Sequence, residues 1–342
     1  MSLKNLSVKI KIPKLLENKL ENKRIRKIYN EFERSLNIDD NFAVAVSGGP
    51  DSLALAFLSK VYSIKKKLIS KFFIIDHKLR KESTQEAKFI QKLLKKNLIS
   101  SEILTWKGIK PLKNIQSVAR INRYELLFKK SDKLKIKHIL LGHHQNDLFE
   151  NFFIRMLRGS GLKGLISLDK KTIIDNKNLC RPLLDQKKSD LIFLTKKVFN
   201  FYIQDPTNKD DKYLRIRVRK LLEELKKDGL DETKLLRTIK NLKNSDYVVS
   251  FYVKENLKKN TNFSTKLNRL VLNEKFFNQP LEVVLRSLSE SIKLIGRRYY
   301  PVRGKKLEKI ITDFNKKSLF RVTLGGCLIE RVNLTVIIRK EN

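Results

Sequence analysis

The chain has 342 residues and a formal net charge of +39, because 75 lysines and arginines are set against only 36 aspartates and glutamates. This length favours two domains, and a hydrophobic content of 41% is sufficient to build their cores. The charge predicts a polyanionic partner, with nucleic acid as the first candidate and an anionic membrane surface as the weaker one. A compositional bias towards lysine is the alternative explanation, although such bias does not by itself deplete acidic residues.

The two cysteines, Cys180 and Cys327, lie far apart in the sequence, which excludes a CxxC zinc site and argues against a disulfide scaffold. This usage is typical of the reducing cytoplasm, where we expect the protein to act. Residues 1–16 lack the apolar core of a signal peptide. No apolar run approaches the roughly 18 residues that span a bilayer, so we expect no membrane partner.

Strand-like and helical segments alternate along the first half of the chain, after a helical extension expected over residues 1–40. Short apolar runs indicate strands, and apolar residues at helical spacing indicate helices. The expected strands are 42–46, 72–75, 102–105 and 138–141, and the expected helices are 51–61, 83–95, 114–129 and 145–157. Ser83 and Glu86 have the spacing of a capping box, with Ser83 as the N-cap. The alternation predicts an α/β fold, a parallel sheet with helices on both faces, in which ligands bind beyond the carboxyl ends of the strands.

The alternation fades after about residue 170. The polar, turn-rich segment 204–211 predicts a hinge, and residues 213–314 are mostly helical and basic in pattern. Two β-prone runs, 320–324 and 328–339, flank Gly325-Gly326 and predict a terminal β-hairpin. We therefore expect a helical extension over 1–40, a catalytic α/β domain over 41–210, and a mainly helical basic domain over 211–342 that ends in the hairpin.

The first expected strand runs directly into Ser47-Gly48-Gly49-Pro50-Asp51-Ser52 and then a helix. Glycine lets the backbone approach a phosphate closely, and a helix N-terminus presents unpaired N–H groups. An ordinary strand-to-helix turn is the alternative, and the lack of a following Gly-Lys-Ser/Thr excludes a Walker loop. The segment resembles the loop of PP-loop ATP pyrophosphatases, which cleave ATP between the α- and β-phosphates. The resemblance implies that residues 47–52 bind ATP and that Asp51 binds Mg²⁺, a cation that prefers oxygen ligands.

A second set of motifs follows the later strands. His143, Asp147 and Glu150 are spaced four and three residues apart, which predicts one shared face near a helix N-terminus. Acidic residues also favour a helix N-terminus for its dipole alone. Arg120 and Arg123 share a helix face and are suited to hold a phosphate or carboxylate, or are simply solvated. The G-x-G-x-x-G pattern at 159–164 follows a helix instead of a strand, so its context excludes a dinucleotide site.

These motifs resemble, in order and spacing, those of the tRNA(Ile)-lysidine synthetases. The matching stretches are 76–80 (DHKLR), 119–124 (ARINRY), 142–150 (GHHQNDLFE), 158–165 (RGSGLKGL), 181–184 (RPLL) and 205–219 (DPTN to RIRVR). Asn146 and Asn151 depart from the family pattern, which has an acid and a threonine there. The resemblance implies catalytic roles for Asp51, Arg123, His143, Asp147 and Glu150. It also implies that Asp76, His77 and Arg215 help to bind ATP.

The family resemblance further implies a reaction and its partners. ATP with Mg²⁺ adenylates the wobble cytidine of a tRNA(Ile) with a CAU anticodon, and lysine then attacks C2 through its ε-amine. Asp147 and Glu150 would hold the lysine ammonium, and the helical domain would bind the tRNA. We expect the reaction to require no other protein, and a homodimer is a possible state of the chain that the sequence does not decide.

Three alternatives remain at this point. A tRNA thiolation enzyme would use the same adenylation but normally needs catalytic cysteines, of which the chain offers only Cys180 and Cys327. A non-catalytic RNA-binding protein would not need the intact motifs at 47–52 and 143–150. An amidating enzyme with a small-molecule substrate would not account for the charge of +39.

Overall fold

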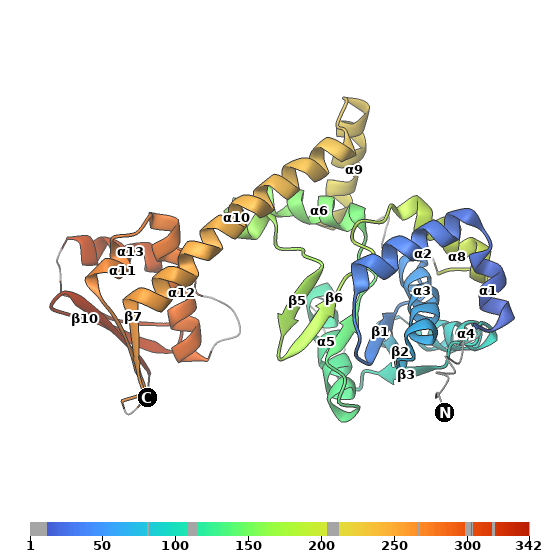
Figure 1. Cartoon of the computed structure of the whole chain (residues 1–342), viewed down its shortest axis with the longest axis horizontal. Coiled ribbons are helices and arrows are strands. Elements are labelled where there is room, and N and C mark those ends of the chain that lie inside the picture. Colours follow the sequence, from blue (N-terminus) through green and yellow to red (C-terminus); the bar gives the residue numbers. More distant parts are fainter. Residues whose placement is uncertain are drawn as a thin grey trace, which may run out of the picture. The chain divides into compact units, whose positions relative to one another are not determined.

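The structure, a computed structural model of the chain (Figure 1), describes residues 12–80, 82–108, 115–203, 212–265, 267–297, 302, 304–316 and 319–341, with residues 115–117 as backbone only. The chain forms two compact units, Met1–Asp231 and Glu232–Asn342. The expected hinge over 204–211 lies outside the described residues. The expected domain boundaries at residues 40 and 210 remain predictions.

The first unit is built on a six-stranded sheet with the order β3-β2-β1-β4-β6-β5. All neighbouring pairs are parallel except β5 with β6. The central strands β1, β2 and β4 therefore end at the same edge of the sheet, with their following loops side by side. The strands are β1 (Phe42–Val46), β2 (Ser70–Asp76), β3 (Ser101–Thr105), β4 (His138–Leu140), β5 (Lys171–Ile174) and β6 (Lys177–Cys180).

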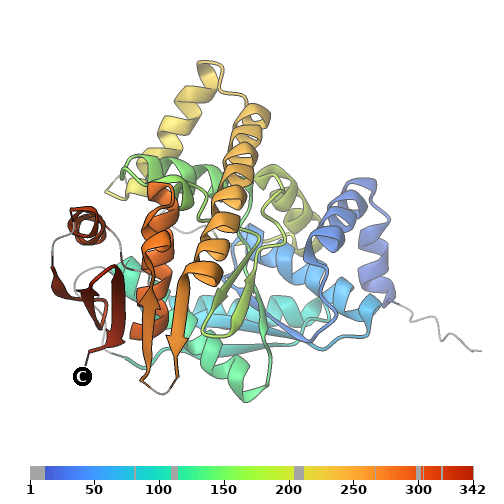
Figure 2. The ribbon, with the colours of Figure 1, turned by 60° about the vertical axis from the view of Figure 1, so that its left-hand side comes forward.

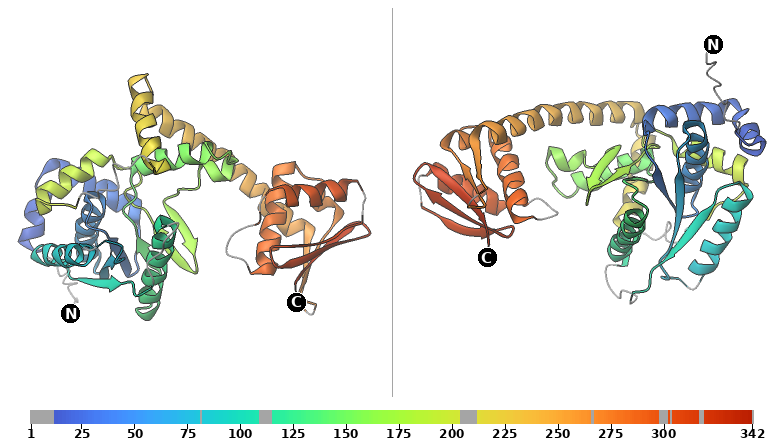
Figure 3. Two further views of the ribbon diagram at one scale, coloured as in Figure 1. Left: turned by 180° about the vertical axis from the view of Figure 1, so that it is seen from behind. Right: turned by 60° about the horizontal axis from the view of Figure 1, so that its bottom comes forward.

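Helices cover both faces of this sheet, which confirms the predicted fold class (Figure 3, right). Phe42 and Val44 of β1 pack towards a core shared with α2, α3, α4 and α8, whereas Ala43 packs with Leu127 of α5 on the other face. The helices of this unit are α1 (Lys14–Leu20), α2 (Lys23–Leu36), α3 (Pro50–Lys66), α4 (Ser83–Lys96), α5 (Ile115–Lys133), α6 (Gln145–Met156), α7 (Leu162–Leu165), α8 (Lys188–Phe199) and α9 (Leu214–Lys227).

The predicted capping box at the start of α4 is wrong. Glu82 occupies the N-cap position and makes no side-chain cap. The Ser83 hydroxyl instead donates to Asp76 Oδ1 at 2.8 Å, and Glu86 pairs with Arg80 at 2.9 Å. The serine is recruited by the buried carboxylate at the end of β2, because a buried charge needs hydrogen-bond donors more than a helix N-terminus in contact with water does.

The second unit combines helices with a five-stranded antiparallel sheet of order β7-β8-β11-β10-β9. The predicted hairpin across Gly325-Gly326 is present, as the pairing of β9 with β10. Its second arm is itself a hairpin, because Asn333 adopts φ +55° and turns the chain between β10 and β11. The elements are α10 (Glu232–Asn260), β7 (Thr261–Ser264), β8 (Arg269–Leu272), α11 (Glu274–Phe277), α12 (Leu281–Gly296), α13 (Lys305–Asn315), β9 (Arg321–Leu324), β10 (Cys327–Val332) and β11 (Thr335–Lys340).

Helices α10 and α12 lie side by side in this unit (Figure 2), and α12 packs on the sheet. Its core contains Phe276, Leu288, Ile292 and Cys327, all fully buried. Within the described residues, no helix is both long and apolar enough to cross a membrane.

Candidate active site

The loop between β1 and α3 has a backbone that glycine alone suits. Gly48 adopts φ +84°, and a Cβ at this position would lie 2.8 Å from Ile203 Cδ1. Gly49 is the N-cap of α3, and Pro50 is its first helical residue. A Cβ on Gly49 would meet no atom closer than Ser47 Oγ at 3.8 Å, so this part of the backbone is open to close approach.

Two serines brace the same loop. The N–H and the hydroxyl of Ser47 both donate to Ser52 Oγ at 3.1 Å, and the Ser52 hydroxyl donates to the Gly49 carbonyl at 3.0 Å. The first turn of any α-helix leaves N–H groups without partners inside the helix, and the helix dipole adds positive potential there. The loop therefore has the shape and the electrostatics of an anion site at the start of α3.

Asp51, in the first turn of α3, is linked to the loop after β4 through His144. Asp51 Oδ2 lies 3.5 Å from His144 Nε2, while Asp51 Oδ1 is buried and has no hydrogen-bond partner within the described residues. His144 Nε2 also lies 3.6 Å from Asp147 Oδ2. Burial would lower the pKa of His144, but the two carboxylates outweigh burial and raise it. His144 thus connects the loop between β1 and α3, called the phosphate loop below, with the acidic residues of α6.

His144 is also the N-cap of α6. Its Nδ1 accepts from the Asn146 N–H at 3.2 Å, and Asp147 Oδ2 accepts from the His144 N–H at 2.9 Å, which together form a capping box. A histidine in this role is fixed on both ring nitrogens, because one caps the helix and the other faces Asp51.

Asp147 and Glu150 lie one turn apart on α6 and are 8% and 2% exposed. Arg215 of α9 bridges them, with Nη2 2.9 Å from Asp147 Oδ1 and Nε 2.5 Å from Glu150 Oε2. Arg219, one turn further along α9, places Nε 2.5 Å from Glu150 Oε1. Burial would raise the pKa of Asp147, but the charges of His144 and Arg215 outweigh burial and lower it. The pair is therefore a buried anionic site that binds a cationic side chain.

His143 lies one residue before the N-cap, and not on the helix itself. Its Nδ1 is buried and has no hydrogen-bond partner within the described residues. Burial lowers the pKa of His143, and the positive charges of Arg181 and Arg120 lower it further. The negative charge of Asp147 would raise this pKa but does not outweigh them. The side chain is consequently a neutral imidazole at pH 7, close to a cluster of arginines.

The loop after β2 carries the remaining predicted residues. The carboxylate of Asp76 is buried and accepts hydrogen bonds from the Lys78 N–H at 3.0 Å, Ser83 Oγ at 2.8 Å and Thr84 Oγ1 at 2.6 Å. Asp76 thus organises its own loop. Burial and the charge of Arg123 on α5 lower the pKa of His77 to about 4, and His77 Nδ1 has no partner among the described residues.

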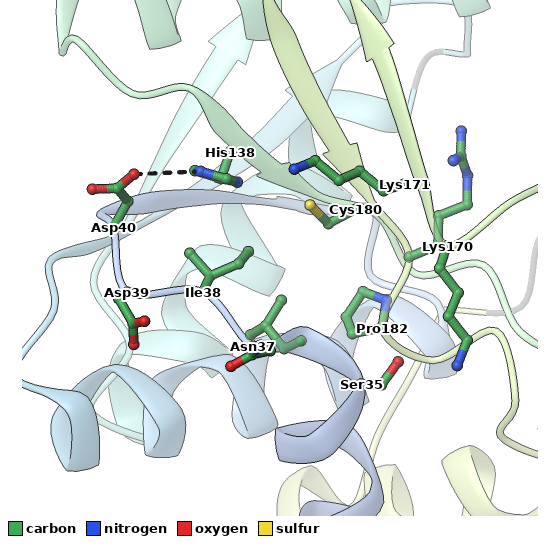
Figure 4. Close-up of a pocket in the computed structure, with 12 residues that line it drawn as sticks. Ser35, Asn37, Ile38, Asp39, Asp40, His138, Lys170, Lys171, Cys180 and Pro182 are labelled. Carbon is green, nitrogen blue, oxygen red and sulfur yellow. Dashed lines mark ion pairs between the residues drawn. The ribbon is translucent and has the colours of Figure 1, made fainter.

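A separate cavity of about 410 Å³ lies near the amino ends of β1 and β4 (Figure 4). Asp40, just before β1, points towards His138 at the start of β4, with Oδ2 3.6 Å from Nε2. Burial lowers the pKa of His138 against the opposing charge of Asp40. Lys171 and Cys180 line the same cavity, which contains none of the predicted site residues.

Comparison with known proteins shows the family to which the chain belongs. The PP-loop domain family matches residues 17–225. A tRNA(Ile)-lysidine synthase of Orientia tsutsugamushi is 34% identical over 320 residues, which span 87% of this chain and 69% of the relative. The chain belongs to the tRNA(Ile)-lysidine synthase family of PP-loop proteins. A second lysidine synthase, from the Wolbachia of Brugia malayi, is 30% identical over 89% of this chain and 71% of its own.

A solved U34-tRNA thiolase of Methanococcus maripaludis shares the fold with this lysidine synthase family member. It superimposes with a TM-score of 0.55 over 64% of this chain and 78% of the thiolase, at 18% identity. At this level of identity the likeness concerns the fold, which these PP-loop proteins have in common.

The residues predicted from the lysidine synthase motifs fall into two groups. Asp51, His143, Asp147, Glu150 and Arg215 gather around the ends of β1 and β4, whereas Asp76, His77 and Arg123 lie by the end of β2. Residues 205–208 of the DPTN motif lie outside the described residues. His144, which was not among the predicted site residues, contacts the acidic group directly. Arg219, at the end of the matching stretch 205–219, pairs with Glu150. His144 carried a usable signal, since a capping residue was to be expected three positions before Asp147.

Proposed function

We propose that this chain is an ATP-dependent ligase that joins lysine to the wobble cytidine of a tRNA(Ile) with a CAU anticodon, forming lysidine. The relatives that match most of the chain are named tRNA(Ile)-lysidine synthase. The observation that carries the proposal is the link from Asp51 through His144 to Asp147, which joins an anion-binding loop to a buried site for a cation. An ATP-dependent ligation that uses an amine needs both sites within one pocket.

The phosphate loop is proposed to bind ATP through the start of α3, with Asp51 holding Mg²⁺. The buried, unpartnered Asp51 Oδ1 suits a hard cation, which takes oxygen ligands. Among the described residues, no group of three or more His, Cys, Asp or Glu side chains could hold a metal ion by itself. Bound there, Mg²⁺ would neutralise phosphate charge as pyrophosphate leaves.

In the first step, the C2 carbonyl oxygen of cytosine bonds to the α-phosphorus of ATP, and the bond to pyrophosphate breaks. In the second step, the ε-amine of lysine bonds to C2, and the C2–O bond to AMP breaks. Asp147 and Glu150 are proposed to bind the lysine ammonium in place of the Arg215 guanidinium, a cation that this pair already accepts. The same pair of carboxylates is proposed to accept the proton that the amine must lose before it attacks.

The tRNA is held mainly by charge, in this proposal. A surplus of 39 positive charges attracts the phosphate backbone, and the wobble base is unpaired and free to enter a pocket. The charge of Arg123 lowers the pKa of His77, and the charges of Asp147 and Arg215 act on the pKa of His143. Both residues therefore lie close to other predicted site residues, and we assign them to contacts with the substrates. The proposal needs no second protein.

The test is incorporation of radiolabelled lysine into a tRNA(Ile) transcript by the purified chain with ATP and Mg²⁺. We expect ATP-dependent label that is lost when the wobble cytidine is replaced by uridine. Asp51→Asn should reduce the rate at least about 100-fold, since it removes the charge proposed to hold the ion. Asp40→Asn, before β1 at the opposite end of the sheet, is the matched control and should leave the rate within about twofold. AMP release without bound lysine would point to a different nucleophile, such as sulfur, and no AMP would leave only RNA binding.

A further inference from the structure

Helix α10 has one face that packs in the core of the second unit and one that does not. Near its end Val253, Asn256 and Asn260 are buried, and Asn256 donates to the Phe276 carbonyl and to Ser287 Oγ. Near its start Leu235 and Ile239 are buried. Between Ile239 and Val253 no residue of α10 is buried, and the structure describes all of that segment. More than three turns of this long helix (Figure 3, right) are therefore not needed to close the core.

The same turns carry large aromatic side chains on the exposed side. Tyr247 is 74% exposed, and Phe251 and Tyr252 are each more than half exposed. The rings of Phe251 and Tyr252 meet edge to face, with centroids 5.6 Å apart. Exposed aromatic side chains gathered at one place mark interaction surfaces, because leaving them in water is unfavourable and the fold gains nothing from them here.

Lysines interleave with these rings along the helix. Residues 240, 247, 251, 254 and 258 follow one another at spacings of seven, four, three and four, so they share one face. We call this set, Lys240, Tyr247, Phe251, Lys254 and Lys258, the α10 stripe; every member is exposed. At 1.5 Å per residue it is about 27 Å long.

The acidic residues of the middle and end of α10 do not neutralise the stripe. Asp246 pairs with Arg286 at 2.5 Å, and Glu255 pairs with Lys259 at 2.7 Å. The stripe therefore keeps a positive potential. A second copy of the same stripe is a poor occupant, because two such rows of lysines repel each other. A polyanion with flat apolar groups is complementary to it.

We propose that the α10 stripe binds an unpaired stretch of RNA, with bases stacked on Tyr247 and Phe251 and phosphates beside the lysines. Single-stranded nucleic acid is bound elsewhere by this combination of stacking platforms and cations, which tolerates many sequences. The inference rests on the proposed function, because the RNA is the tRNA of that reaction. It adds a stacking surface in the second unit that is separate from the predicted catalytic residues, all of which belong to the first.

The test compares affinity for tRNA(Ile) among full-length variants, measured without ATP or lysine at several salt concentrations. Tyr247→Leu with Phe251→Leu keeps apolar bulk but removes stacking, and should weaken binding about 10-fold or more without changing the salt dependence. Tyr247→Phe should bind like the wild type. Lys254→Gln should reduce the slope of log affinity against log salt by about 1. Phe263→Leu, on β7 and 46% exposed, is the matched control and should bind within twofold of the wild type.

Three outcomes would overturn the inference. The double leucine variant binds tRNA within twofold of the wild type, or Phe263→Leu weakens binding equally. Alternatively, sedimentation shows that the double variant abolishes a wild-type dimer while tRNA affinity per chain is unchanged, which makes the stripe an interface between copies. Because binding is measured without the reaction, lysine incorporation that fails while these affinity differences hold contradicts the proposed function alone.

Discussion

His144 joins two acidic residues that come from different parts of the sheet edge. Its ring faces Asp51 in the first turn of α3 and Asp147 at the start of α6, and it is 2% exposed. Two neighbouring carboxylates repel each other, and a hydrogen-bond donor placed between them reduces this repulsion. His144 Nδ1 accepts the Asn146 N–H, so the ring carries its proton on Nε2, which faces both acids and holds them in one place. Positions of the phosphate loop and the acidic pair are coupled through this one side chain.

His77 provides a test of the electrostatics at the end of β2. Burial and Arg123 lower its pKa to about 4, from an ordinary value of about 6.5. Between these two values the unfolded chain binds a proton that the folded protein does not. The stability contributed by neutral His77 is therefore present above about pH 6.5 and lost as pH falls towards 4.

We expect His77→Gln to change this acid sensitivity. Between pH 7 and pH 5 the melting temperature of the wild type should fall more than that of the variant, while from pH 7 to pH 8 their difference should stay constant. Thermal unfolding at fixed ionic strength measures both. Parallel curves over the whole range would mean that His77 titrates normally in the folded protein.

Single residues were predictable where a motif fixes both spacing and context. Ser47 to Ser52 follow β1 as expected, because a strand, a glycine turn and a helix form one local unit. His143 and His144 are adjacent and chemically identical, and only the position where α6 begins decides which of them caps the helix and meets Asp51. Helix boundaries are the least certain part of sequence reasoning, so His144 was missed.

At the scale of elements, α9 supplies the cationic partners of Asp147 and Glu150. It contributes Arg215 and Arg219 to Glu150, whose side chain is only 2% exposed. Removing the cationic partner of a buried carboxylate commonly lowers the free energy of unfolding by about 3–5 kcal/mol. The packing of α9 on α6 is therefore tied to the ionic state of Glu150.

A double-mutant cycle on Arg219 and Glu150 tests this link. Arg219→Gln should lower the melting temperature in the wild-type background and have a smaller effect when Glu150→Gln is present, with a coupling of about 1–3 kcal/mol. Arg217→Gln is the control on the same helix, since the Arg217 side chain donates to the Lys212 carbonyl. Equal effects of Arg219→Gln in both backgrounds would leave Glu150 stabilised by Arg215 alone.

Elements were predictable where period and length agree. The first four strands and their helices were found because each strand is a short apolar run between turn residues. Strands β5 to β8 were missed: all four have four residues, and their polar members, such as the run Lys177 to Cys180, hide any alternation. They are strands because neighbouring strands pair with them, which is tertiary information.

For the whole molecule, the structure divides the chain after Asp231 and keeps α9 with the first unit. A chain that ends at Lys212 lacks α9 and leaves Asp147 and Glu150 without Arg215 and Arg219. A chain that ends at Asp231 keeps those pairs. The two truncations differ by one helix and a turn, yet differ in whether buried charges are neutralised.

We expect the chain ending at Asp231 to melt cooperatively and to bind ATP, and the chain ending at Lys212 to do neither. Removing residues 232–342 takes away 24 basic and 10 acidic residues and leaves a net charge of +25. The chain that ends at Asp231 should therefore still bind tRNA, but more weakly and with a shallower dependence on salt, because fewer phosphates are neutralised. Thermal unfolding, ATP binding and tRNA titrations at several salt concentrations decide the outcome. If affinity and salt slope match the full chain, the tRNA is held by the first unit alone.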